Sequence, residues 1–407
     1  MRKRILVIGA GFAGMWSALA SARLLAEVGR DDVELVLIAP APELHVRPRL
    51  YEKHPEGMKA PLQDIFAAVD VRFVHGLVRH IDVDAHEVTY VGTGEGAGSD
   101  APVHTLGYDR LVLATGSRLF APPIPGLDEY AFNVDQIADA AMLEVHLNGL
   151  AMRPATRARN TVIVAGGGFT GIETAAEMPA RLREALGEDA EVSVIVVERN
   201  AEIGPDLGPG PRPVIAQALA ELGVTWQLGV GVAAIDEHGV TLDNGERLEA
   251  GTVIWTAGAR ASRLTEQIPG ERCALGRLHV DATLKVIGVE DVYATGDVAY
   301  AATDDDGNFA KMSCQHAMNL GRSAGHNVAA DLLGEPTIPY RQPKYVTCLD
   351  LGPWGAVYTE GWDREVKLSG AEAKALKTKI NTEWIYPPRA DRAEILALAD
   401  PRRIVVA

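Results

Sequence analysis

The sequence predicts an α/β fold with two Rossmann-like domains, the first interrupted by the second, and a small α+β region towards the C-terminal end. Two observations predict this architecture. A glycine motif of the form G-x-G-x-x-G occurs twice, each time between a short apolar run and a helical pattern. The segments that follow each motif also recur in the same order, which indicates an internal repeat.

The first motif follows residues 5–8, a short apolar run that predicts a buried parallel strand, and it precedes a helical pattern over 15–28. The motif consists of Gly9, Gly11 and Gly14, with Phe12 and Ala13 between the last two. Its first glycine allows a tight turn, its second lets a phosphate approach the backbone, and its third lets helix and strand pack closely. Free N–H groups at the start of the helix then bind a pyrophosphate, so the motif predicts a dinucleotide site.

The second motif follows a strand over 161–165 and precedes a helix from about 172 to 186. It consists of Gly166, Gly168 and Gly171, with Phe169 and Thr170 between the last two. The next strand, 192–197, ends at Glu198, and a carboxylate there suits two ribose hydroxyls and repels a 2′-phosphate. The second site is therefore expected to prefer NADH. Two alternatives stay open: Glu198 as a surface turn residue, and Arg199 as a contact for a 2′-phosphate.

The repeat extends beyond the glycines. A strand over 78–82 and a hairpin follow the first motif, and a strand over 232–236 and a hairpin follow the second. Asn244-Gly245 in the later hairpin favours a type I′ turn. Each copy then ends in a strand and a loop of small residues, which supply further candidate binding residues: Ala114, Thr115 and Gly116 in the first copy, and Gly258 in the second. Two copies imply two dinucleotides.

Composition excludes several classes of protein. The net charge of −16 repels phosphate backbones, so no nucleic-acid partner is expected. The three cysteines, Cys273, Cys314 and Cys348, are far apart, which argues against a disulfide framework and favours a reducing, cytoplasmic location. The basic start of the chain leads into only four apolar residues, so a strand is expected there rather than a signal peptide. No transmembrane helix and no metal site are predicted.

With these motifs, the chain resembles the two-dinucleotide-binding-domain flavoproteins, the pyridine nucleotide–disulfide reductase-like superfamily, over nearly its whole length. A further motif at 291–299 contains Thr-Gly-Asp, with Gly296 and Asp297. In that superfamily the aspartate of this motif contacts the ribityl chain of FAD. The resemblance therefore implies FAD at the first glycine motif, with Asp297 in that role, and NADH at the second.

Among the members of this superfamily, the chain is most similar to the type II NADH:quinone oxidoreductases. Disulfide reductases and sulfide:quinone oxidoreductases need cysteines that this chain lacks, since none precedes Cys273. Residues 47–52, Arg-Pro-Arg-Leu-Tyr-Glu, resemble the Pro-Leu-Leu-Tyr of the type II enzymes more than the Arg-Pro-Pro-Leu-Ser-Lys of ferredoxin reductase-like members. Residues 313–321 resemble the Ala-Gln motif that opens a helix near the flavin. Gln315 matches its first glutamine, and Asn319 replaces the second.

The resemblance implies that hydride passes from NADH to N5 of FAD and that electrons then reach a quinone-type acceptor. A helix starting near Ser313 would stabilise negative charge on the flavin. Glu173 matches a subfamily glutamate near the nicotinamide, with a first-turn helix carboxylate as the alternative. Glu173 and Gln315 are the candidates for positioning and proton supply. His316 is another candidate proton donor because an unperturbed histidine has a pKa of ~6.5, with a packing histidine as the alternative.

The expected division of the chain is an FAD-binding domain at 1–120 and 256–335, an NAD-binding domain at 121–255, and a C-terminal acceptor or interface region at 336–407. In that last region a helix over 371–384 presents a basic side of Lys374, Lys377 and Lys379. From 361 onward there are nine basic and seven acidic residues, which permits peripheral contact with the inner face of the membrane. An interdomain or dimer-contact helix is the alternative.

Three hypotheses remain open for the function. The first is an FAD-dependent NADH dehydrogenase that reduces a quinone, which the Gln315 motif favours. The second is a soluble NADH-dependent flavin reductase with another small acceptor or an electron-carrier protein, which Asn319 and the weakly amphipathic C-terminal helix favour. The third is a nonenzymatic NADH-responsive flavoprotein. A homodimer is expected because dimers are common in the superfamily.

Overall fold

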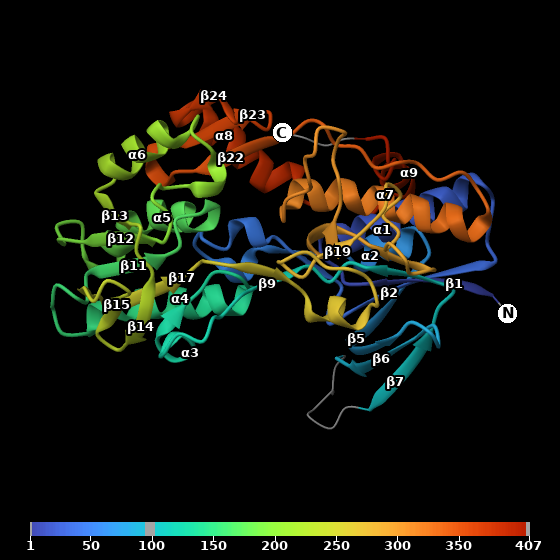
Figure 1. Ribbon diagram of the computed structural model, residues 1–407, viewed down its shortest axis with the longest axis horizontal. Helices are drawn as coiled ribbons and strands as arrows, with labels where there is room; N and C mark the ends of the chain where they lie inside the picture. Colours follow the sequence, from blue (N-terminus) through green and yellow to red (C-terminus); the bar gives the residue numbers. More distant parts are fainter. Residues whose placement is uncertain (1, 94–101, 404–407) are drawn as a thin grey trace.

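The computed structural model describes residues 2–93 and 102–403. Two mainly parallel sheets form the two halves of the molecule, and a small C-terminal sheet lies beside the helices of the second half (Figure 1). In the described part of the chain, no helix combines the length and hydrophobicity that a membrane crossing requires.

The first sheet has the strand order β20-β8-β1-β2-β5-β6-β7, and its first five strands are parallel. Residues 5–8 in β1 are fully buried, as expected for a central strand covered on both faces. The strands are β1 Lys3–Ile8, β2 Val33–Ala39, β5 Val71–Asp82, β6 Glu87–Gly92, β7 Val103–Gly107, β8 Arg110–Leu113 and β20 Val292–Ala294.

The second sheet has the order β10-β17-β11-β12-β13 and is parallel throughout. Each of its strands has a counterpart at the same place in β20-β8-β1-β2-β5, so the internal repeat and the two Rossmann-like halves are confirmed. The strands are β10 Ala131–Phe132, β11 Thr161–Ala165, β12 Ser193–Glu198, β13 Val224–Leu228 and β17 Thr252–Trp255.

Helices connect and cover these strands, and among the described residues two three-stranded antiparallel sheets and three two-stranded sheets complete the fold. The helices are α1 Phe12–Glu27, α2 Gln63–Ala68, α3 Leu127–Tyr130, α4 Ile137–Gly149, α5 Phe169–Leu186, α6 Arg212–Glu221, α7 Cys314–Leu333, α8 Gly370–Lys379 and α9 Arg392–Leu398. The three-stranded sheets consist of β14 Val232–Asp236, β15 Gly239–Leu242 and β16 Arg247–Glu249, and of β22 Val346–Asp350, β23 Ala356–Glu360 and β24 Glu365–Ser369. The two-stranded sheets pair β3 Glu43–His45 with β4 Lys59–Pro61, β9 Ser117–Leu119 with β18 Ala259–Ala261, and β19 Leu278–His279 with β21 Ala299–Tyr300.

The β15–β16 hairpin differs from the predicted type I′ turn. That turn needs positive φ at both central residues, but Gly245 has a φ of +85° and Asn244 has no positive φ. The N–H of Gly245 donates to the carbonyl of Leu242 at 3.0 Å, which closes a turn one residue earlier. Gly245 then takes the left-handed position after the turn, so the loop is one residue longer than predicted.

The predicted basic side of the C-terminal helix is also wrong. Lys377 is only 5% exposed, and its ammonium points inward. Lys374 forms an ion pair with Asp350, which lies on β22. Beyond Lys379 the helix continues as a π-helical segment over Ile380–Trp384. Lys377 and Lys374 therefore pair with Glu173 and Glu177 of α5, and of the three lysines only Lys379 is exposed.

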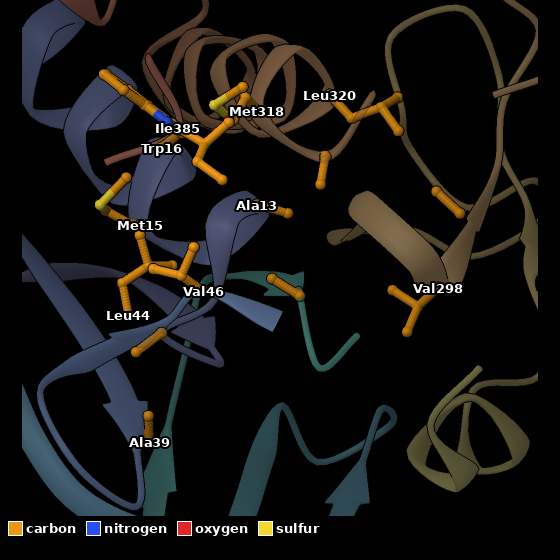
Figure 2. Close-up of a cluster of buried hydrophobic side chains, with 14 of the residues drawn as sticks. Ala13, Met15, Trp16, Ala39, Leu44, Val46, Val298, Met318, Leu320 and Ile385 are labelled. Carbon is orange, nitrogen blue, oxygen red and sulfur yellow. The ribbon is translucent and has the colours of Figure 1, made fainter. Parts of the chain in front are cut away.

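Helices α1 and α7 cross in backbone contact. A Cβ atom on Gly321 would lie 2.5 Å from the carbonyl oxygen of Ala13, and one on Gly325 would lie 2.1 Å from that of Ser17. The hydroxyl of Ser17 donates to the carbonyl of Gly321 at 3.1 Å. Figure 2 shows side chains of both helices in one buried cluster, among them Ala13, Met15, Trp16, Met318 and Leu320. The contact fixes where both helices begin.

We expect Gly325→Ala to lower the free energy of unfolding by about 1–3 kcal/mol, because the added methyl group overpacks a rigid backbone contact. Urea unfolding measures the change. Gly57→Ala is the control, since a Cβ at Gly57 meets no atom within 4 Å. Equal stability of the two variants would show that α1 and α7 do not depend on this close approach.

Candidate active site

The two glycine motifs form the same structure at corresponding places in the two halves. Gly9 and Gly166 have φ of +109° and +118°, which few residues other than glycine adopt. A Cβ on Gly14 would lie 1.9 Å from the carbonyl oxygen of Gly9, and one on Gly171 would lie 1.8 Å from that of Gly166. These four positions therefore tolerate no side chain, as the tight turn and the close helix–strand packing require.

The middle glycine of each motif has open space instead. A Cβ on Gly11 or Gly168 would meet no atom within 4 Å. Each is the N-cap of the helix that begins at Phe12 or Phe169, and neither cap has a side-chain hydrogen bond. The first N–H groups of α1 and α5 therefore face an open space, where they can bind the phosphates of a dinucleotide.

The other residues predicted for the first site come from the ends of β8 and β20, which are neighbours in the sheet: Ala114, Thr115, Gly116, Gly296 and Asp297. The Thr115 hydroxyl is buried and has no hydrogen-bond partner among the described residues. Asp297 Oδ2 accepts a hydrogen bond from Ser117 Oγ at 2.6 Å and lies 3.9 Å from Arg47 Nη1. A cofactor with hydroxyl groups, such as FAD, fits this combination of an unsatisfied hydroxyl and a carboxylate.

At the second site, Glu198 ends β12 beside the glycine loop, and it is 8% exposed. Its Oε2 accepts the N–H of Gly167 at 2.7 Å, and its Oε1 accepts two hydrogen bonds from Asn200. The carboxylate thus holds the glycine loop at the end of β12. Arg199 points to the surface, and Gly258 has a φ of +87° in the loop after the neighbouring β17.

A buried ion pair lies close to this second site. Glu173 in the second turn of α5 is 4% exposed, and its Oε1 accepts hydrogen bonds from Lys377 Nζ at 2.8 Å and from the N–H of Asp350 at 3.0 Å. Burial raises the pKa of Glu173 to about 7, since the attraction of Lys377 offsets the burial only in part. Burial acts to lower the pKa of Lys377, but the Glu173 carboxylate outweighs it and raises that pKa, so the lysine remains charged.

Asp350 extends this pair into a network. Its Oδ2 accepts a hydrogen bond from the hydroxyl of Tyr51 at 3.0 Å, and its Oδ1 accepts one from Lys374 at 2.5 Å. Burial raises the pKa of Tyr51 well above its usual value, so Tyr51 keeps its proton. The network therefore connects α5, α8 and β22 to the segment that follows β3 Glu43–His45.

The start of α7 faces the same region. Lys377 Nζ lies 5.6 Å from the centre of the Phe169 ring, at the start of α5. Cys314, the first residue of α7, is partly buried, and desolvation raises the pKa of its thiol to about 11; Lys377 and Asp297 also act electrostatically on it. The second glycine loop, the Thr-Gly-Asp motif and the start of α7 therefore surround one region, where two bound dinucleotides would meet.

Gln315 and His316 lie in the first turn of α7. The Gln315 side chain donates to the carbonyl of Val346 at 3.4 Å, and its Oε1 is buried without a partner among the described residues. His316 is fully buried, and its Nδ1 lies 3.0 Å from Ser313 Oγ. Burial, together with nearby cations such as Lys311, lowers the pKa of His316 to about 3. His316 is therefore neutral at pH 7, which corrects the ordinary pKa on which its expected role as a proton donor rested.

The sequence did not identify Lys377, Asp350, Tyr51 or Arg47 as site residues. A signal for Lys377 was present, because Ala373 and Lys377 lie one turn apart on the buried face of α8 and Ile380 follows at helical spacing. Tyr51 and Arg47 belong to the motif at 47–52, which indicated a subfamily but gave no role to a single residue.

The comparisons with known proteins agree with this geometry. Residues 3–321 match the family model described as pyridine nucleotide-disulphide oxidoreductase. An NADH dehydrogenase-like protein of Mycobacterium tuberculosis is 48% identical over 98% of both chains. A demethylphylloquinone reductase of Synechocystis is 31% identical over 91% of this chain and 89% of its own. In fold, NDH2 of Plasmodium falciparum in complex with NADH matches with a TM-score of 0.76 over 98% of both chains, at 15% identity.

None of the three cysteines forms a disulfide, and desolvation raises the pKa of the partly buried Cys314 to about 11 and that of the buried Cys348 to about 12. Thiolate chemistry is thus unfavourable at both positions. Because residues 3–321 match the family model, the chain belongs to the pyridine nucleotide-disulphide oxidoreductase family. It is a flavin-dependent enzyme with FAD and NADH as its cofactors.

Proposed function

We propose that the chain is an FAD-dependent NADH dehydrogenase that transfers hydride from NADH to N5 of FAD and passes the electrons to a quinone-type acceptor. The observation that supports this most is the buried Glu173–Lys377 pair at the place where the two dinucleotide sites and the start of α7 meet. The names of two groups of relatives point to the same class of acceptor: the demethylphylloquinone reductase, and type II NADH:quinone oxidoreductases of staphylococci at 25–28% identity.

When bound, FAD supplies the two-electron chemistry between NADH and the acceptor. In this proposal the starts of α1 and α5 hold the two pyrophosphates, and Asp297 and Thr115 hold hydroxyl groups of FAD. The free N–H groups at the start of α7 favour negative charge on the flavin side. Gln315 faces the acceptor with its Oε1, which has no hydrogen-bond partner within 2–93 and 102–403.

Glu173 is the proposed source of the proton that a quinone takes up on reduction. With a pKa of about 7, its carboxyl group is protonated in about half of the molecules at neutral pH. Lys377, which stays charged, holds the carboxyl group in place. When the proton leaves Glu173, the positive charge of Lys377 stabilises the carboxylate that remains. Glu173 thus acts at the junction between the nicotinamide and the acceptor.

The proposal includes the arrangement of the whole chain. FAD binds to residues 1–120 and 256–335, NADH to 121–255, and the acceptor reaches the region 336–407. That last region contacts the inner face of the membrane through residues such as Trp384, which is 36% exposed with Lys379 Nζ 5.5 Å from its ring. The enzyme is a homodimer.

We expect Glu173→Gln to slow the reoxidation of the reduced flavin by a soluble quinone and to remove its dependence on pH near 7. In the wild type that rate falls as pH rises through about 7, because the protonated form of Glu173 is lost. Anaerobic stopped-flow mixing from pH 6 to pH 8 covers about one pH unit on either side of the Glu173 pKa. It gives the reoxidation rates of the wild type and of Glu173→Gln.

The control is Glu177→Gln, one turn further along α5, which should keep the pH profile of the wild type. An unchanged profile in Glu173→Gln would remove this residue from proton transfer. If Glu173→Gln slowed flavin reduction by NADH as much as it slowed flavin reoxidation by the quinone, Glu173 would be assigned to nicotinamide binding alone.

For the coenzyme, we expect the wild type to favour NADH and Glu198→Gln to reduce the NADH-to-NADPH ratio of kcat/KM by about tenfold or more, as loss of charged hydrogen bonds implies. Glutamine retains an acceptor oxygen for the N–H of Gly167, so the loop is preserved. Glu202→Gln, at an exposed glutamate, is the control. A wild type that prefers NADPH would contradict the role given to Glu198.

A further inference from the structure

Glu173 is almost fully buried, yet in the proposed reaction it gives up a proton in every turnover. NADH, a quinone and a proton become NAD⁺ and a quinol, and the proton comes from Glu173. Its two hydrogen-bond donors, Lys377 Nζ and the N–H of Asp350, belong to residues that are 5% and 4% exposed. Glu173 therefore needs a path by which it regains a proton from solvent.

Asp350 connects this buried region to the surface of the molecule. Figure 1 shows β22 and α8, which carry Asp350 and Lys374, beside α5. The Oδ1 atom of Asp350 accepts a hydrogen bond from Lys374 Nζ at 2.5 Å, and 35% of the Lys374 side chain is exposed. Its Oδ2 atom accepts a hydrogen bond from the hydroxyl of Tyr51 at 3.0 Å, and Tyr51 is 2% exposed. The carboxylate thus has a partner that reaches solvent on one oxygen and a buried partner on the other.

The hydroxyl of Tyr51 is bonded to the carboxylate of Asp350 and lies close to that of Glu173. After burial, the Glu173 carboxylate raises the pKa of Tyr51 most, ahead of Asp350. Lys377 Nζ is 2.8 Å from Glu173 Oε1 and 6.0 Å from the centre of the Tyr51 ring, so both residues lie around one ammonium group. A hydroxyl can donate one hydrogen bond and accept another, so Tyr51 can pass a proton on while it keeps one of its own.

The neighbouring titratable groups provide no other route to Glu173 among the described residues. Lys377 donates its other hydrogen bond to the carbonyl of Cys348 at 3.0 Å, and a carbonyl has no proton to supply. The remaining groups face the network without a hydrogen bond to its carboxyl and hydroxyl groups: Glu177 and Arg181 on α5, Glu52 beside Tyr51, the thiol of Cys348 on β22 and that of Cys314 at the start of α7. The hydrogen bonds therefore favour the route through Asp350 and Tyr51.

We propose that Asp350 and Tyr51 relay a proton from Lys374 at the surface to Glu173 after each turnover. This relay rests on the proposed function, because it replaces the proton that Glu173 gives to the quinone. Lys374 transfers a proton to Asp350 and regains one from water. Asp350 passes its proton to the oxygen of Tyr51, and the hydroxyl turns and releases its original proton to Glu173. Lys374, Asp350 and Tyr51 end the sequence unchanged, and Glu173 gains one proton from solvent.

Two rates measured on the FAD-loaded protein at pH 6 separate the relay from the steps that precede it. Anaerobic stopped-flow mixing of the NADH-reduced protein with a soluble quinone gives the first reoxidation, for which Glu173 already carries its proton because its pKa is about 7. Steady-state kcat with NADH and the quinone requires Glu173 to be reprotonated in every cycle. Tyr51→Phe should therefore lower kcat by about tenfold or more, as expected for loss of a proton-transfer group, and should slow the first reoxidation much less.

The control for Tyr51→Phe is Tyr358→Phe, which removes a hydroxyl that donates to Glu360 at 3.1 Å on β23 and should keep the wild-type kcat. Lys374→Met should lower kcat as Tyr51→Phe does, whereas Lys367→Met, at a lysine of similar exposure on β24, should not. Sodium azide should restore part of the lost kcat, because the small acid HN₃ carries protons to the buried carboxyl group. Azide would not rescue the loss of a side chain that only packs in the site.

Wild-type kcat in both Tyr51→Phe and Lys374→Met would overturn the relay and leave the proposed function standing. Equal losses in kcat and in the first reoxidation, without rescue by azide, would also overturn the relay, because Tyr51 would then only hold Glu173 in place. A wild-type protein that the quinone does not reoxidise would overturn the proposed function and the relay together.

Discussion

The ion pair between Glu173 and Lys377 is the interaction on which the arrangement of the three parts of the chain depends. The two residues are 204 positions apart, and both are almost fully buried. Removal of one partner from such a pair leaves an isolated buried charge, at a cost of about 3–5 kcal/mol. The C-terminal sheet and α8 are therefore held against the start of α5.

The contact between α1 and α7 has the equivalent role in the first half. Because Gly321 and Gly325 lie against the backbone of α1, the two helices cannot shift or separate without loss of packing. The start of α1, which would hold a pyrophosphate, is thereby set at a fixed distance from the start of α7, which faces Asp297 and Lys377. Two rigid contacts, one in each half, thus direct three helix N-termini to the same region of the molecule.

The parts of the fold that depend on local sequence could be predicted. The glycine loops follow from backbone conformations and close contacts that only glycine permits, so Gly9, Gly14, Gly166 and Gly171 predicted both cradles and the repeated order of strands. The prediction of a type I′ turn at Asn244-Gly245 was wrong because two turn types accept a glycine at position 245. The register of the two strands decides between these turn types.

The features that depend on tertiary packing could not be predicted in the same way. His316 has an ordinary pKa only when it is exposed, and its burial results from the C-terminal region that covers it. Lys377 was assigned to a solvated face because lysine is rarely buried without a partner, and its partner Glu173 lies in another part of the chain. Pairs of this kind become visible only when both elements are placed.

In the proposed reaction, the electrons from NADH leave this protein to a quinone. Anaerobic stopped-flow mixing of the NADH-reduced protein with a soluble quinone, with oxygen and with an oxidised ferredoxin, in parallel, tests it most directly. The quinone is expected to reoxidise the flavin fastest and within the time of catalytic turnover. Faster reoxidation by oxygen or by the ferredoxin, or slow reoxidation by all three, would contradict it.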